Sequence, residues 1–213
     1  MSLCVTYTGS TGCQETFIDL PGLAPQTVRI EIAVNRSEPG WCLAPGAQEF
    51  TAVINGEPYN ILIVAPEDVE VHPPEKWGSE SPDSGALYLA TWKLYKRRSN
   101  NPVVVAIQFL PLGSLTSCHY HNLEMYETFH SLDKSGLVTI HTEDTVKRTQ
   151  DHCLLGNTSI RVGPRVAHQL ECMRPENWHA EQFAAQLLVM EGQVTYPDRQ
   201  DHIRYRSLVE APP

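Results

Sequence analysis

The sequence predicts an all-β protein. Short segments rich in Val, Ile, Thr and aromatic residues recur along the chain, and clusters of Gly, Pro, Asn and Asp separate them. This alternation of short apolar segments with turn residues is typical of antiparallel strands joined by turns, whereas a parallel sheet would need a long helical segment after each strand. The 213 residues, of which 41% are hydrophobic, suffice for one main core and a small addition to it.

The expected strands follow one another from the N-terminal third onward. The turn NGEP at 55–58 predicts a hairpin between two of them. A second hairpin is expected from YETFHSL and LVTIHTE around the turn DKSG, and a further strand pair is expected at 158–162 with 166–172. The segment 174–182 is expected to be a loop or one helical turn. The predicted strands are 27–34, 49–54, 59–64, 86–95, 102–109, 126–132, 137–143, 158–162, 166–172 and 183–192.

Composition excludes several function classes. The formal net charge of −9 disfavours nucleic acid and anionic membranes, because both require clustered Lys and Arg. The start of the chain lacks the pattern of a secretory signal, and no apolar run is long enough to span a bilayer. We therefore expect a cytoplasmic protein. Its six cysteines lack CxxC spacing, which favours reduced thiols over a zinc knuckle or a disulfide framework.

The chain divides into three expected parts. Residues 66–85 are acidic and rich in proline, so they are expected to be a linker or loop between an N-terminal β extension and the main domain. The predicted division is 1–85 for extension and linker, 86–195 for the main domain, and 196–213 for a C-terminal tail. The extension is expected either to add strands to the main sheet or to make a homodimer contact.

Histidine is concentrated in one stretch. Seven of the nine histidines lie between 119 and 179. His119 and His121 are two apart, and in a strand this spacing places both imidazoles on one face. A carboxylate and a third imidazole from neighbouring strands would complete a set of three nitrogens and one oxygen. Such a set suits iron, manganese, nickel, copper or zinc better than magnesium or calcium.

Two motifs surround these histidines. Gly113 stands six residues before His119, and Glu127 opens the next strand. Further on, GNTSIRVGPRVAH holds Gly156, the turn GPR and His168. In these segments the sequence resembles the cupin superfamily, whose first motif is Gly-x5-His-x-His-x3–4-Glu-x6-Gly and whose second is Gly-x5-Pro-x-Gly-x2-His. The resemblance covers about residues 86–195.

The chain departs from this pattern in its turns. Glu127 comes one residue late, Gly136 two residues late, and the second motif has one extra residue, all in turns that tolerate insertion. Arg165 replaces a glycine that commonly permits positive φ. Arginine there implies either a different turn or a side chain aimed at the barrel mouth, where it would clamp a substrate carboxylate. Glu124 competes with Glu127 for the carboxylate role, and we favour Glu127.

The resemblance implies the fold and the site. The fold would be a cupin double-stranded β-helix, a jelly-roll barrel with an N-terminal β-rich extension. One divalent transition metal per chain would be held by four ligands, His119, His121, Glu127 and His168, and iron is the expected metal, with zinc, manganese, nickel and copper as alternatives. His130 should point out of the barrel.

The implied function is a metal-dependent enzyme acting on a small organic molecule. An Fe(II) dioxygenase is expected first, with Glu127 as a general base. The alternatives are a non-redox isomerase, epimerase or lyase, in which the metal acts as a Lewis acid, and a small-molecule-binding or regulatory barrel without turnover. The expected substrate-binding residues are Arg165, Gln108, Phe129 and Tyr120. Tyr126 and Gln186 are further candidates for the pocket.

Overall fold

The computed structural model places all regular structure in strands. It describes residues 2–9, 12–19, 27–34, 47–54, 57–67, 69–72, 75–77, 87–94, 103–132, 136–156, 158–176, 183–193 and 202–209. Within these ranges the strands form three sheets, and none of these residues is helical. The predicted all-β class is therefore confirmed. No described segment is a helix that is both long and apolar enough to cross a membrane.

The N-terminal sheet has the order β2-β1-β3-β5-β4. Two hairpins build it, β1 with β2 and β4 with β5, and β1 also pairs in parallel with β3. The predicted hairpin around 55–58 is confirmed, since Ile54 pairs with Glu57. The strands are β1 (Ser2–Gly9), β2 (Gly12–Asp19), β3 (Thr27–Val34), β4 (Ala47–Ile54) and β5 (Glu57–Val64).

The second sheet runs β14-β11-β16-β9-β8-β6, and β7 also pairs with β8. Strands β6 and β7 come from the proline-rich segment expected to be a linker, so part of that segment is paired into this sheet. The strands are β6 (Val69–Val71), β7 (Glu75–Trp77), β8 (Leu87–Leu94), β9 (Val103–Pro111), β11 (Met125–Ser131), β14 (Ser159–Val162) and β16 (Phe183–Gly192).

The third sheet has the order β13-β12-β15-β10-β17 and faces the second across the barrel interior. Its edge strand β17 comes from the segment predicted as a C-terminal tail. The strands are β10 (His119–His121), β12 (Val138–Glu143), β13 (Thr149–Leu154), β15 (His168–Cys172) and β17 (His202–Arg204).

Two predicted strand pairs are wrong. Strand β11 pairs with β14 and β16, whereas β12 pairs with β13 and β15, so the two strands flanking DKSG lie in different sheets. The same holds for β14 and β15. Each of these turns carries the chain from one wall of the barrel to the other. A short polar turn can join two paired strands of one sheet or two strands of facing sheets. Which of the two forms depends on where the apolar side chains of the flanking strands are buried.

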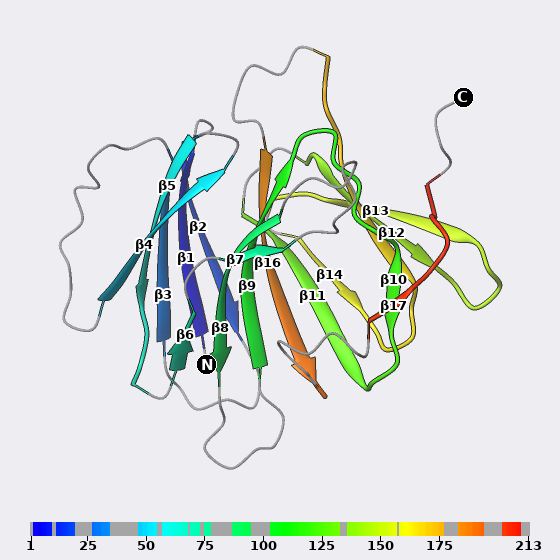
Figure 1. Ribbon diagram of the computed structural model, residues 1–213, viewed down its shortest axis with the longest axis horizontal. Coiled ribbons are helices and arrows are strands. Elements are labelled where there is room, and N and C mark those ends of the chain that lie inside the picture. Colours follow the sequence, from blue (N-terminus) through cyan, green and yellow to red (C-terminus); the bar gives the residue numbers. More distant parts are fainter. Residues whose placement is uncertain are drawn as a thin grey trace.

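Strands β9 and β16 are buried on both faces because two cores share them. Figure 1 shows them between the N-terminal strands, in blue and cyan, and the strands β10, β12 and β13. Alternate side chains of each strand therefore meet different neighbours. The residues of β9 that pack against the N-terminal sheet are Val103, Val105, Ile107 and Phe109. Those that fill the barrel are Val104, Ala106 and Leu110.

Candidate metal centre

Four side chains converge inside the barrel. His119, His121, Glu127 and His168 each offer one ligand atom, and these atoms lie within 4.8 Å of one another. Opposite ligands of a single ion are about 4 Å apart. The structure thus brings together the four residues that the sequence resemblance implies, and they can hold one metal ion.

Strand register explains why the cluster forms. His119 and His121 alternate with Tyr120 on β10, so both face inward, and His119 lies directly opposite His168 of β15. Glu127 comes from the facing sheet, where it alternates with the buried core residues Met125 and Phe129 of β11. The third sheet therefore supplies the imidazoles and the second sheet supplies the carboxylate.

The Glu127 carboxylate is buried against two imidazoles. Its Oε2 atom lies 2.7 Å from Nε2 of His168 and 3.4 Å from Nε2 of His121. Burial alone would raise the pKa of Glu127, but the electrostatic interaction with the adjacent imidazole of His168, together with the close contact of His121, outweighs it and holds that pKa well below its ordinary value. Glu127 is therefore an anion over the physiological pH range, as a metal ligand must be.

Two of these buried atoms lack the geometry of a hydrogen bond. Oε2 of Glu127 and Nε2 of His168 are shielded from solvent, and neither has a hydrogen-bond partner of acceptable geometry. Such atoms are costly in a protein interior unless something else satisfies them. A cation bound between them would satisfy both, so the residues present fit a metal ion.

Backbone carbonyls set the tautomers of two imidazoles. Nδ1 of His119 donates to the Ser117 carbonyl at 3.1 Å, and Nδ1 of His168 donates to the Val166 carbonyl at the same distance. A carbonyl oxygen only accepts, so in each ring Nδ1 carries the proton and Nε2 presents its lone pair to the cluster. This arrangement of outer hydrogen bonds is typical of histidines that ligate metals.

The motif turns hold the ligand strands in place. Gly113 and Gly136 have φ values of 78° and 64°, in the region that glycine adopts most readily. Arg165 has φ 59°, so it keeps the positive φ of the glycine that it replaces. Its backbone N–H donates to the His121 carbonyl at 3.0 Å, which ties the turn to β10. The Arg165 side chain is exposed.

The two candidate carboxylates have different surroundings. Glu127 is inside the cluster, whereas Glu124 lies in the bend before β11 and its side chain is exposed. The Glu124 carbonyl accepts a hydrogen bond from the Gln193 N–H at 3.0 Å. Glu124 therefore belongs to the turn between β10 and β11, and Glu127 belongs to the centre.

Phe129 and Gln108 both face the barrel interior but at different depths. The Phe129 ring centroid is 6.1 Å from that of His168, so Phe129 borders the centre. Gln108 lies directly opposite Gln186 of β16. The Gln186 Nε2 donates a hydrogen bond to Gln108 Oε1 at 2.5 Å, and the buried Oε1 of Gln186 accepts none. Gln186 lies four residues along β16 from Met190, the partner of Glu127, or about 13 Å away. The glutamine pair is thus remote from the four ligands.

Two predicted pocket residues lie on outer faces. Tyr120 alternates with the two ligand histidines and therefore points the opposite way, where it packs with Tyr205 near Cys118. Tyr126 alternates with Glu127 in the same manner, and its ring is covered by the Arg161 guanidinium at 4.4 Å. Neither belongs to the ligand-bearing faces, because side chains alternate along a strand.

Sequence reasoning missed a polar pair beside the centre. Thr142 lies directly opposite His168, so its side chain shares the inner face of the sheet. Its Oγ1 is 3.0 Å from Nε2 of His152 on β13. No spacing in the sequence indicates this pair, because it depends on the order of strands β13-β12-β15.

His141 lies on the outer face of the same sheet. It is buried between two carboxylates, with Nδ1 2.7 Å from Asp151 and Nε2 3.1 Å from Glu171. These two contacts use both ring nitrogens and point in different directions. His141 is therefore held by hydrogen bonds to these two carboxylates on the outer face and is not a ligand of the centre.

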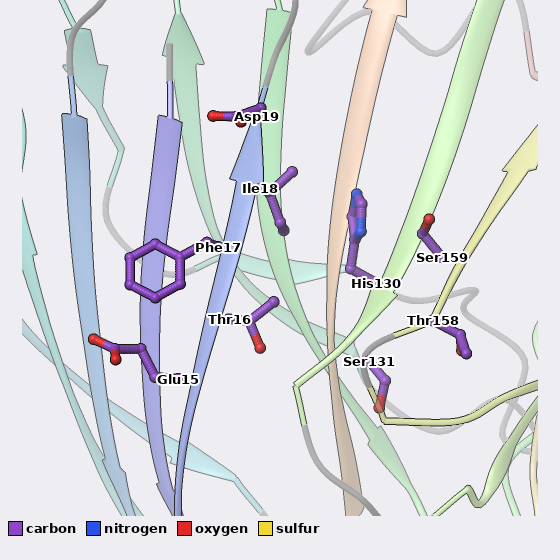
Figure 2. A pocket seen from close by; sticks show the side chains of 9 residues that line it. All are labelled: Glu15, Thr16, Phe17, Ile18, Asp19, His130, Ser131, Thr158 and Ser159. Atoms are coloured by element: carbon purple, nitrogen blue, oxygen red, sulfur yellow. The ribbon is translucent and has the colours of Figure 1, made fainter.

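A pocket of about 450 Å³ lies elsewhere, between β2 and the outer face of the barrel. Figure 2 shows that His130 of β11 projects toward Thr16 and Ile18, whereas Glu15, Phe17 and Asp19 project from the other side of β2. The predicted outward direction of His130 is thus confirmed. None of the four ligand residues lines this pocket.

Two facing antiparallel sheets enclose three histidines and one glutamate, so the chain has a barrel of the cupin type with a group of side chains that could hold a metal ion. The predicted fold class, a jelly-roll barrel with an N-terminal β-rich extension, is confirmed. No family model matches the sequence, and no curated protein matches it.

Solved structures of Bacillus subtilis oxalate decarboxylase are similar to this chain. A point mutant of that enzyme has 12% identity and a TM-score of 0.45, over 63% of this chain and 30% of that one. A structure from a study of its Mn(II) centres has 10% identity and a TM-score of 0.43, over 77% and 33%. The structure of the same enzyme at pH 4.6 has 10% sequence identity and a TM-score of 0.44, and the match covers 77% of this chain and 33% of that one. This chain spans about a third of their length, and the function proposed below rests on its own residues.

Proposed function

We propose that this protein is a metal-dependent enzyme that acts on a small organic molecule at the centre formed by His119, His121, Glu127 and His168. The observation that carries the proposal is the pair of buried atoms in that centre, Glu127 Oε2 and His168 Nε2, which have no hydrogen-bond partner of acceptable geometry. A site built only for stability would satisfy them with hydrogen-bond donors and acceptors.

Four protein ligands leave part of the coordination shell of a transition metal open to a substrate. When bound, a divalent metal there would polarise an oxygen of the substrate as a Lewis acid or, if it is redox-active, would support reaction with dioxygen. Three imidazoles and one carboxylate suit several such metals. One ion per chain is the expected stoichiometry, since one group of ligands is found among the described residues.

The residues around the centre have separable roles in this proposal. Glu127 is ionised and buried, which is the protonation state that holding the ion requires, and we propose that it also acts as the general base toward a bound substrate. Phe129 is 2% exposed and borders His168, so it excludes water from one side. Arg165 lies in the exposed turn bonded to β10, from where it could meet an anionic part of the substrate.

Two reaction classes use these same ligands. In an Fe(II) dioxygenase, dioxygen is consumed and a bond of the substrate is cleaved oxidatively. In a non-redox lyase or isomerase, the substrate is converted without dioxygen. Because both need the same four side chains, the metal that loads and the requirement for dioxygen distinguish the two classes.

The first experiment is elemental analysis of the purified protein beside the His121→Ala and His168→Ala variants. We expect about one equivalent of a transition metal in the wild type and a loss of most of it in both variants. Oxygen uptake is then recorded with diketones, flavonols and thiols, and anaerobic turnover with small carboxylates. Iron with oxygen uptake supports the dioxygenase, whereas zinc, manganese or nickel with anaerobic turnover supports the lyase or isomerase.

A wild type that binds no metal after reconstitution would overturn the proposal and leave a binding module without turnover. The Arg29→Ala variant is a suitable control, because Arg29 lies on the N-terminal sheet and is 61% exposed. Its metal content should equal that of the wild type.

We also propose that residues 1–85, 86–195 and 196–213 are extension, barrel and C-terminal segment, where β6 and β7 of the first part and β17 of the last add strands to the barrel sheets. We further propose that the protein forms a cytoplasmic homodimer. Light scattering on the eluted protein tests the dimer. A monomer over the micromolar range would contradict it.

A further inference from the structure

The C-terminal strand β17 lies against the strand that carries two of the ligand histidines. It pairs antiparallel with β10, and Arg204 is directly opposite His119. Figure 1 shows β17 beside β10 at the edge of the third sheet. Residues that are directly opposite in an antiparallel pair project from the same face of the sheet, with Cβ atoms about 5 Å apart. Arg204 therefore projects from the face that carries the centre.

The neighbours of Arg204 on β17 confirm this orientation. Tyr205, the next residue, packs on the outer face, where its ring centroid is 6.0 Å from that of Tyr120. Its backbone N–H donates to the Cys118 carbonyl at 2.9 Å, which continues the pairing with β10. Since side chains alternate along the strand, Arg204 lies on the inner face while Tyr205 lies on the outer.

Buried polar side chains fix this strand in place. Glu143, whose side chain is 2% exposed, accepts hydrogen bonds from the Tyr205 hydroxyl at 2.9 Å and from the Arg206 guanidinium at 2.5 Å. Oε1 of Gln169 accepts hydrogen bonds from the Ser207 hydroxyl at 3.1 Å and from the Leu208 N–H at 2.8 Å. The residues that directly follow Arg204, 205–208, are thus anchored to the barrel by these two side chains.

The guanidinium of Arg204 also differs in its charge balance. Four other arginines, Arg29, Arg148, Arg161 and Arg206, form ion pairs with carboxylates. Among the described residues, Arg204 shares with Arg165 and Arg174 an exposed side chain without such a partner, and of these three it is the one that lies opposite a ligand histidine. A divalent ion held by one carboxylate keeps a net positive charge, so the ion and Arg204 together favour an anion at this face.

We propose that Arg204 binds a carboxylate of the substrate while another donor atom of the same molecule meets the metal, so that the substrates are small carboxylates with a second oxygen donor. This inference rests on the proposed function, because it requires the ion. A guanidinium can hold a carboxylate through two parallel N–H···O bonds, which fixes the orientation of the molecule as well as its charge.

The test uses the full-length protein reconstituted with Co(II), whose visible absorption reports on anion binding. The anions are malonate, succinate and glutarate, whose spacers differ in length, and acetate, which can meet the ion but cannot also span to Arg204. In Arg204→Gln we expect the best-bound dicarboxylate to bind about tenfold more weakly, and acetate to bind within twofold of wild type. Arg204→Lys should recover part of the affinity, because it restores charge without the two-pronged geometry.

Arg29→Gln is the matched control for the loss of one positive charge, and dicarboxylate binding should be unchanged in it. Equal weakening of acetate and dicarboxylates, no weakening at all, or the same weakening in Arg29→Gln would overturn the inference. Loss of Co(II) from both Arg204 variants would assign the residue to the metal centre itself and would also overturn it. A wild type that fails to bind Co(II) overturns the proposed function, which is a distinct result.

Discussion

Oε2 of Glu127 lies 2.7 Å from Nε2 of His168, although the two residues belong to facing sheets. This contact joins the walls of the barrel at the centre. It also places an ionised carboxylate against a nitrogen whose ring proton is on the opposite side, bonded to the Val166 carbonyl. The pair is therefore arranged to share a cation.

Replacing Glu127 by Gln should weaken metal binding at least tenfold, because a neutral amide cannot supply the charge of the carboxylate ligand. Mn(II) affinity measured by calorimetry checks this. Glu124→Gln is the matched control, since the same chemical change three residues earlier affects an exposed side chain outside the cluster. Equal affinities for Mn(II) in the two variants would contradict the assignment of Glu127.

The ligand set could be predicted from the sequence because its signal is local. His119 and His121 share a strand face by period alone, and the motif spacing extends to Glu127 and His168 with small insertions in turns. Arg165 could be singled out in the same way. Its backbone conformation could not be predicted, because arginine there was expected to imply either a different turn or a side chain aimed at the barrel mouth, and the turn keeps the positive φ of the replaced glycine.

The rest of the site depends on strand order, which no local pattern encodes. Thr142 reaches the inner face beside His168 only because β12 pairs with β15. Arg204 lies opposite His119 only because residues expected to be a tail form β17. The segments flanking DKSG resemble a hairpin in sequence. In the structure they lie in facing sheets, and their apolar side chains meet in the barrel core.

Arg165→Gly should stabilise the protein by about 0.5–1 kcal/mol. Arginine at φ 59° carries a steric cost that glycine avoids, and the greater freedom of glycine in the unfolded chain offsets part of the gain. Urea unfolding measures the difference. Arg165→Ala keeps a Cβ atom and should show no such gain, so an equal gain in both variants would attribute the effect to the loss of the arginine side chain.

Glu143→Gln should loosen the C-terminal strand while the barrel remains folded. Glu143 accepts hydrogen bonds from Lys147, Tyr205 and Arg206, and these bonds to the carboxylate, with that from Lys147 foremost, lower the pKa of Glu143. Limited trypsin digestion should cleave after Arg204 or Arg206 several-fold faster in the variant. Unchanged cleavage would show that the hydrogen bonds of Gln169 hold the strand alone.

Leu187→Ala should destabilise the whole chain by about 3 kcal/mol. Leu187 is fully buried where β16 packs on the N-terminal sheet, so the truncated side chain leaves a cavity in the core that the two sheets share. Leu155→Ala, at a position 53% exposed, is the control and should change stability by less than about 0.5 kcal/mol. A single urea transition, shifted as a whole, would show that both sheets unfold together.

Acid should weaken the fold through His130. Burial on the outer face of β11 lowers the pKa of His130 from 6.5 to about 4, because the charged imidazole loses solvent there. Between these two values the unfolded chain binds a proton that the folded chain does not. Stability therefore falls as the pH decreases from about 6.5 toward 4, by about 2 kcal/mol at pH 5 from this group.

His130→Gln removes this titration and leaves a neutral polar side chain in the pocket. Urea unfolding of wild type and variant at pH 7.5 sets the baseline difference, because the wild-type imidazole is neutral in both states there. At pH 5 the wild type should lose about 2 kcal/mol more than the variant does. Parallel losses in the two proteins would mean that the imidazole becomes protonated without cost, which would contradict the prediction.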